Sequence, residues 1–149
     1  VFRYIIQSDK KGLVALQDEL NFVEAFRYMM EVRFANKLEF DIEVDCQWMN
    51  LSIPVLSLLP VIDNVVVHNV IDSEHKMKIT IRLNEKKELV VTNPVFPKFT
   101  PPDTNGTGLK NLDSRFSLLL NRHITTENKA GFFTVCLPLT ASTDETADR

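Results

Sequence analysis

The sequence contains few of the residues that mark several common classes of protein. Only two of its 149 residues are cysteine, and Cys46 and Cys136 are too far apart to form a CxxC metal or redox motif. Two distant cysteines are typical of small buried thiols in a reducing compartment. No apolar run approaches the ~20 residues that cross a bilayer, and no signal-peptide pattern begins the chain. We therefore expect a soluble, cytoplasmic polypeptide that makes no membrane contact itself.

The sequence also lacks an excess of positive charge. It has 17 lysine and arginine residues against 20 aspartate and glutamate residues, which gives a formal net charge of −3. A nucleic-acid surface needs a basic stripe, and none is present, so we expect no nucleic-acid partner. Apolar residues are plentiful, at 44% of the sequence, and they are enough to fill the core of one domain.

The two ends of the chain differ in pattern from its middle. Residues 1–6, Val-Phe-Arg-Tyr-Ile-Ile, begin without a helix cap, as though the chain started inside a longer helix. Residues 141–149 are polar and unpatterned, which favours a disordered tail. We interpret residues 1–13 as the end of a helix and a linker, residues 14–140 as one domain, and the chain as a fragment of a larger protein.

Hydrophobic periodicity predicts three helices. Between residues 16 and 34, apolar side chains recur at helical spacing over about five turns. A second helix covers roughly residues 55–70, where Pro60 marks either a bend or a first-turn position. A third helix runs from residue 109 to about residue 121. Three further residues, Met29, Met30 and Trp48, are interpreted as packing residues.

Alternation of apolar and polar residues predicts strands over residues 38–44 and 77–83. Further strands are predicted beside polar turns, over residues 89–92, 124–127 and 132–137. Polar turns at residues 84–87 and 128–131 join strands into hairpins. Residues 94–107 contain four prolines and cannot be regular, and a connection of this length is usually a functional lid or disordered. Alternation in the strands indicates that helices cover one sheet face and water the other. We therefore predict an α/β (α+β) fold, a two-layer α/β sandwich.

The second predicted helix carries polar residues within an otherwise apolar sequence. Asn64 and His68 are four residues apart and share one face, and Asp63 lies about 100° from Asn64. The amide oxygen of Asn64 could hold Mg²⁺, which takes few protein ligands and completes its shell with water and substrate phosphates. Asp63 could accept a proton or orient a metal-bound water. The alternative is an ordinary solvated helix edge.

The segment before the third helix has the composition of an anion-binding turn. A Gly-x-Gly sequence leads directly into the helix, so free N–H groups and the positive end of the helix would face a phosphate. Glycine also occurs in capping turns, so a purely structural role stays open. The residues concerned are Gly106, Thr107, Gly108, Leu109 and Lys110.

Three other polar residues have simpler interpretations. Asn93 ends an apolar strand where the irregular segment begins, and its amide could pair with an adenine edge or cap a turn. His75 and His123 have no evident partner in the sequence, and we interpret both as surface residues.

Taken together, these motifs resemble the ATP-binding catalytic domain of sensor histidine kinases. More narrowly, they resemble the LytS-like class, whose response regulators carry a LytTR DNA-binding domain. Residues 16–34 look like the linker helix of that class, residues 53–68 like its N box, and residues 106–116 like its second glycine box. Residues 135–139 fit its last strand, so the similarity covers nearly the whole chain.

The resemblance implies the Bergerat fold of the GHKL ATPases, with a mixed, mostly antiparallel sheet covered on one face by helices. It implies that Asn64 ligates Mg²⁺, that residues 95–107 form an ATP lid, and that the γ-phosphoryl group of ATP passes to a histidine. ATP would be contacted by His68 and Asn93 and by residues 106–110. Residues 1–6 look like the end of a dimerisation helix. The implied whole protein is a homodimeric, inner-membrane-anchored kinase whose partner is a response regulator of the LytTR type.

The sequence departs from the family pattern at three places. Asp63 replaces the usual Glu of the N box, Asn93-Pro94-Val95 replaces an Asp-x-Gly box, and Phe132 stands about where a nucleotide-contacting Thr is often found. None of the three histidines has the His-Phe context of the phosphoacceptor, so the fragment is expected to bind ATP without phosphorylating itself. Two alternatives stay open: a degenerate domain that acts as an interaction scaffold, and a serine kinase of the same superfamily.

Overall fold

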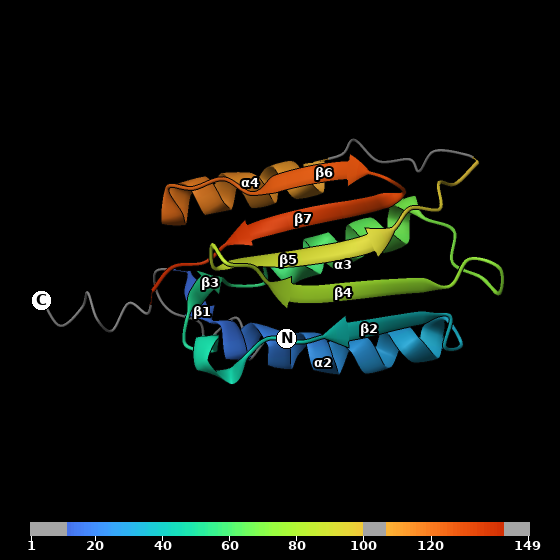
Figure 1. Cartoon of the computed structure of the whole chain (residues 1–149), viewed down its shortest axis with the longest axis horizontal. Coiled ribbons are helices and arrows are strands. Elements are labelled where there is room, and N and C mark those ends of the chain that lie inside the picture. Colours follow the sequence, from blue (N-terminus) through green and yellow to red (C-terminus); the bar gives the residue numbers. More distant parts are fainter. Residues whose placement is uncertain (1–11, 100–106, 142–149) are drawn as a thin grey trace, which may run out of the picture.

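The computed structural model describes residues 12–99 and 107–141, which form three helices packed on a five-stranded sheet. The strand order is β2-β4-β5-β7-β6; β2 and β4 are parallel, and the other pairs are antiparallel. The helices lie together behind the sheet, with α2 behind β2 and α4 behind β6 (Figure 1). The predicted two-layer sandwich with a mixed, mostly antiparallel sheet is confirmed. The elements are β2 (Leu38–Ile42), β4 (Met77–Leu83), β5 (Glu88–Pro94), β6 (Thr125–Lys129), β7 (Phe132–Pro138), α2 (Leu16–Arg33), α3 (Leu58–His68) and α4 (Thr107–Leu120).

The core lies between the sheet and the helices, and it follows from the alternation in the strands. Ile81, Val91 and Val135 lie side by side across three strands, and each is at most 1% exposed. Their neighbours in the sequence point to the opposite face, which none of α2, α3 and α4 covers (Figure 1). Because side chains alternate along a strand, one apolar row per strand is enough to bind the helix layer.

Three short elements were not predicted. Strands β1 (Leu13–Ala15) and β3 (Ser52–Pro54) pair antiparallel in a separate two-stranded sheet, and a 3₁₀ turn, η1, covers Cys46–Trp48. Elements of three residues are too short to show a period. The predicted second helix is also shorter than expected, beginning at Leu58 after Leu56 adopts a positive φ of 57°. Pro60 therefore lies in the first turn of α3, which confirms the first-turn interpretation of this proline.

Two packing predictions were wrong. Cys46 is exposed on η1 and Cys136 is only half-buried, so neither is the enclosed thiol that we expected. Met29 is 59% exposed, whereas Met30 is 5% exposed. Consecutive helical residues point about 100° apart, so only one of the two methionines can face the sheet. Trp48 does pack, with its ring beneath the ammonium group of Lys87 at 4.1 Å.

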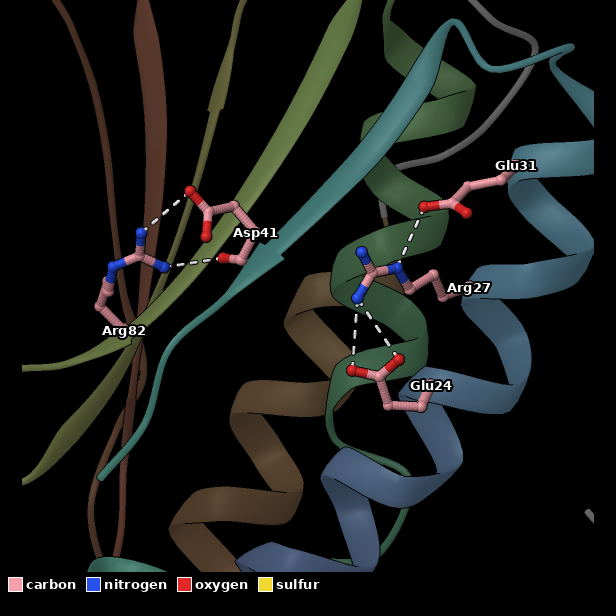
Figure 2. Close-up of polar contacts among 5 residues, drawn as sticks. All are labelled: Glu24, Arg27, Glu31, Asp41 and Arg82. Carbon is pink, nitrogen blue, oxygen red and sulfur yellow. Dashed lines mark hydrogen bonds and ion pairs between the residues drawn. The ribbon is translucent and has the colours of Figure 1, made fainter. Parts of the chain in front are cut away.

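Partly exposed charges on the sheet and on α2 form short-range pairs (Figure 2). The guanidinium group of Arg82 on β4 contacts the Asp41 carboxylate at 3.0 Å and donates to the Asp41 carbonyl oxygen at 2.7 Å. These contacts attach the edge strand β2 to its neighbour. On α2, Arg27 pairs with Glu24 and Glu31 one turn away on either side. Exposed pairs of this kind stabilise a fold only slightly.

The pKa of Asp41 provides a test of the contact between β2 and β4. The hydrogen bond from Arg82, helped by the charges of Arg82 and Lys78, lowers the pKa of Asp41 below its ordinary 3.8, although partial desolvation opposes the shift. A lowered pKa means that the bond stabilises the fold above pH 3.8 and that this contribution is lost as the pH falls through the lowered value. We expect an NMR titration of the Asp41 carboxyl carbon to give a midpoint below 3.8, and Arg82→Met to return it toward 3.8. Lys78→Met should change the Asp41 midpoint less than Arg82→Met does. A wild-type midpoint at or above 3.8 would contradict the contact between Arg82 and Asp41.

A buried carboxylate on α2 holds the start of α3. Glu19 is 0% exposed, and its two oxygens accept hydrogen bonds from the N–H groups of Leu58 (2.9 Å) and Leu56 (3.1 Å). The N-cap residue, Ser57, does not cap the helix, because its hydroxyl donates to the Pro54 carbonyl oxygen at 2.5 Å. A carboxylate at a helix N-terminus satisfies its free N–H groups and its positive dipole. Glu19 therefore replaces the missing local cap from 39 residues away.

Arg115 on α4 holds the same turn from the other side. Its guanidinium group donates to the carbonyl oxygen of Val55. Burial lowers the pKa of Arg115, and the negative charge of Glu19 opposes this shift. The turn between β3 and α3 thus takes a carboxylate from α2 and a guanidinium from α4. These contacts fix how α3 and α4 lie relative to each other.

The interpretation of both chain ends stays a prediction, because residues 1–11 and 142–149 lie outside the described residues. Within the described ranges, no helix combines the length and the apolar character that crossing a membrane requires.

Candidate functional site

The structure brings the polar face of α3 and the first turn of α4 to one cavity. The cavity has a volume of about 160 Å³ and lies between the two helices. Three of the residues singled out in the sequence come from α3, and two come from α4. The lining residues are Pro60, Asp63, Asn64, Val67, His68, Gly108 and Leu109.

The sequence of α3 explains which side chains reach this cavity. The apolar residues Leu58, Val61, Ile62 and Val65 are buried and face the sheet. Asp63 and His68 are exposed, and Asn64 is half-buried at the border between the apolar and polar faces. The apolar stripe therefore sets the rotation of the helix, and this rotation directs the polar residues to the cavity.

Gly108 and Leu109 belong to the first turn of α4. The N–H groups of a first turn have no acceptor within the helix, so they can bind an anion. A Cβ atom added to Gly108 would meet nothing within 4 Å. Packing within the described protein therefore does not require glycine there, and the space above its backbone is open to a ligand.

A second cavity adjoins the first and shares Asn64 and His68 with it. Its volume is about 350 Å³, within the usual size range of small-molecule sites. Apolar side chains and amide groups line it, a combination that suits a flat heteroaromatic ligand. The other lining residues are Asn69, Val95, Pro97, Asn128 and Phe133.

Asn93 lies beside this second cavity, at the end of β5. It is 2% exposed and is in register with Phe133, which lines the cavity and is in turn in register with Asn128. The amide nitrogen of Asn93 donates to the carbonyl oxygen of Pro94 at 2.7 Å. This bond leaves the amide oxygen as the atom that can accept a hydrogen bond.

Asn69, the first residue after α3, was not predicted from its sequence position. Asn69 is 7% exposed; its amide nitrogen donates to the Val65 carbonyl oxygen at 2.9 Å, and its amide oxygen accepts from the Phe96 N–H at 2.7 Å. An asparagine at a helix end is so often a cap that its type alone gives no signal. Phe133 was missed as well, because the sequence pointed to its neighbour Phe132, which is 49% exposed and lines neither cavity.

The remaining candidates take other positions. Thr107 and Lys110 are exposed and line neither cavity, and Gly106 lies outside the described residues. His123 is exposed and His75 is half-buried, and each has an aspartate partner, Asp113 at 3.0 Å and Asp72 at 2.8 Å. The hydrogen bond from His75 lowers the pKa of Asp72.

The donors in the first cavity suit a hard cation that is shared with a ligand. Asn64 offers an amide oxygen and Asp63 a carboxylate, and both lie beside open space. Within residues 12–99 and 107–141, no cluster of three or more His, Cys, Asp or Glu side chains could hold a metal ion. Mg²⁺ is commonly bound by one or two protein oxygens together with water and substrate phosphates.

The fold is that of the catalytic domains of histidine kinases. The nucleotide-free catalytic domain of histidine kinase ThkA superimposes with a TM-score of 0.60 at 18% identity, covering 87% of this chain and 97% of that domain. The cytoplasmic segment of histidine kinase QseC gives a TM-score of 0.56 at 15% identity, over 85% of this chain and 77% of that segment. A blue-light activated histidine kinase of Erythrobacter litoralis gives 0.52 at 14% identity, over 89% and 44%. Because the sequence identities are this low, the likeness shows the fold alone.

Among curated proteins, the chain is similar to the sensor protein LytS of Oceanobacillus iheyensis. The two are 28% identical over 75 residues, which is 50% of this chain. The chain spans 13% of the length of that relative. No protein-family model matches the chain.

Proposed function

We propose that the chain is the ATP-binding catalytic domain of a sensor histidine kinase of the LytS-like class. In the whole protein it would transfer the γ-phosphoryl group of ATP to a histidine upstream of this fragment. A response regulator would then receive the group. The main support is the convergence of Asn64 and the first turn of α4 on one cavity, in a fold shared with histidine kinase catalytic domains.

The two adjoining cavities suggest how ATP would lie. The first cavity combines helix N–H groups, which can bind phosphate, with side-chain oxygens that can ligate Mg²⁺, so it would take the triphosphate. The second has apolar walls formed by Val95, Pro97 and Phe133, so it would take the base. His68 lines both cavities and would lie where the two parts of the nucleotide join.

Within the first cavity, Asn64 would hold Mg²⁺ through its amide oxygen. The bound ion would neutralise charge on the phosphates, which is a large part of catalysis in phosphoryl transfer. Asp63 would orient a metal-bound water or accept a proton, with a reach one methylene shorter than that of a glutamate. The N–H groups of Gly108 and Leu109 would bind phosphate oxygens, and Thr107 and Lys110 would add contacts from the same end of α4.

Asn93 would recognise adenine with its amide oxygen. The bond from its nitrogen to Pro94 orients the side chain, so that the oxygen can accept a hydrogen bond from the adenine amino group. An uncharged acceptor makes a weaker hydrogen bond than a carboxylate would. We therefore expect ATP to bind less tightly here than to a domain with aspartate at this position.

The similarity to LytS motivates proposals about the whole protein. It would be a homodimer anchored in the inner membrane, with this domain in the cytoplasm, and its response regulator would be of the LytTR type. The isolated fragment would bind ATP without phosphorylating itself.

Calorimetric titration of the chain with ATP in excess Mg²⁺ tests the proposal. We expect saturable heat with one ATP bound per chain, and weaker binding of GTP, which lacks the adenine amino group. A flat trace at millimolar ATP would instead support a non-catalytic scaffold of the same fold. The replacements Asp63, Asn93 and Val95 favour that alternative, because each alters a position that the family uses for nucleotide.

A further inference from the structure

Asn69 connects the end of α3 to the segment that follows β5. Its side chain uses both of its polar atoms, one on the Val65 carbonyl oxygen and the other on the Phe96 N–H. The next residue, Val70, donates its N–H to the carbonyl oxygen of Phe96 at 2.8 Å. Residues 69 and 97 also form an isolated β-bridge. The chain around Phe96 is therefore held against the helix by both main-chain and side-chain contacts.

Other contacts hold the same segment from its remaining sides. The N–H of Val95 donates to the carbonyl oxygen of Gly131 at 2.9 Å. The ring of His75 packs edge-on against the ring of Phe96, with 5.1 Å between the ring centroids. Prolines 94 and 97 fix their own φ angles, and the β-branched Val95 has few rotamers, which makes the segment stiff. Val95 and Pro97 thereby form a fixed wall of the second cavity.

Among these contacts, the hydrogen bond that the Phe96 N–H donates to the Asn69 amide oxygen links this wall to a side chain at the end of α3. Asn69 is nearly buried, so a substitution that removes the amide leaves the Phe96 N–H and the Val65 carbonyl oxygen without these partners. Unpaired polar groups in a poorly solvated place are costly, and the segment would move to regain partners. Such a movement would widen the second cavity and leave the first unchanged.

We propose that Asn69 is a positioning residue for base binding, which acts by holding Phe96 so that Val95 and Pro97 form one wall of the base cavity. The proposal rests on the proposed function, because it assumes that ATP occupies the two cavities. It assigns Asn69 an effect on affinity for the nucleoside part of ATP and no effect on affinity for the triphosphate. This separates Asn69 from Asn64, which contributes to the triphosphate end.

The test compares two ligands, ATP and inorganic tripolyphosphate, each titrated in excess Mg²⁺. For Asn69→Ala we expect ATP affinity to fall about tenfold and tripolyphosphate affinity to stay within about twofold of wild type. Asn69→Asp keeps an acceptor for the Phe96 N–H, so the ratio of the two affinities should stay within about twofold of the wild-type ratio. Taking the ratio reduces the effect of the added charge, which repels both anionic ligands. Asn21→Ala, an exposed substitution on α2, is the matched control.

The outcomes separate this inference from the proposed function. A flat wild-type trace with ATP would overturn both. A wild type that binds ATP, with an Asn69→Ala variant that loses both ligands equally or neither, would overturn the positioning role alone. Hydrogen exchange on the wild type without nucleotide supplies a measurement that needs no variant. The Phe96 amide should be protected, and exchange at the rate of an open chain would contradict the hydrogen bond from the Phe96 N–H to Asn69.

Discussion

Replacing Asn64 with alanine should weaken the binding of ATP in excess Mg²⁺ by at least about 100-fold, or about 2.7 kcal/mol. Asn64 lines both cavities, and its amide oxygen would be a direct ligand of the ion that neutralises the triphosphate. Loss of that ligand would weaken binding of the ion and leave phosphate charge uncompensated. Calorimetric titration measures the change, and thermal unfolding of the same variant shows that the fold is kept.

Metal dependence gives the stricter form of this test. Wild-type affinity for ATP should fall when Mg²⁺ is removed with a chelator, whereas Asn64→Ala should bind ATP about equally with and without the ion. The exposed substitution Asn21→Ala should behave as wild type under both conditions. If Asn64→Ala keeps the full magnesium dependence, the ion is held by other groups and the assignment of Asn64 is wrong.

Replacing Glu19 with alanine should lower the free energy of unfolding by about 3 kcal/mol. The carboxylate is fully buried, and its loss leaves the Leu56 and Leu58 N–H groups without that acceptor. It also removes the negative charge that faces the half-buried Arg115. For a domain of this size the midpoint of thermal unfolding should fall by roughly 10 °C. Chemical denaturation and a thermal melt measure the two quantities.

Glu24→Ala is the matched control, because this glutamate lies on the same helix, is exposed and makes an ion pair with Arg27 at the surface. Its effect should stay within about 0.5 kcal/mol. Glu19→Gln keeps the shape of the side chain but presents an amide nitrogen to one of the two N–H groups. Its loss of unfolding free energy should therefore lie between those of Glu24→Ala and Glu19→Ala. A loss of less than about 1 kcal/mol in Glu19→Ala would mean that water caps α3 equally well.

Most of the fold could be predicted from the sequence, because long elements carry a readable period. The apolar positions of β4 alternate, and those of α2 and α3 recur at helical spacing, so the type and the buried face of these elements were both evident. In β5, three consecutive apolar residues left the buried face open, and the structure shows which side chains alternate inward. The ends of elements were less evident, since they depend on contacts from elsewhere. The start of α3 is set by Glu19 and by the positive φ of Leu56, and neither leaves a local pattern. The short strands β1 and β3 are stabilised by pairing with each other.

The candidate site divides in the same way. The shared face of Asn64 and His68, with Asp63 about 100° away on the same helix, could be predicted, since local geometry fixes it. Their meeting with Gly108 and Leu109 needed the packing of α3 against α4, and their roles in binding stay predictions. Asn69 and Phe133 were not found, because only the three-dimensional arrangement shows that they line the second cavity.

The sequence alone determined that this chain forms a layer of helices on a mixed sheet, and it determined which polar residues interrupt the apolar pattern. Both follow from interactions within a few residues, where backbone geometry and burial leave little choice. The tertiary structure decided which of those residues share a cavity, and which buried groups hold the cavity in shape. Those outcomes depend on partners far apart in the chain, such as Glu19 with Leu58 and Asn69 with Phe96, whose pairing no local pattern can specify.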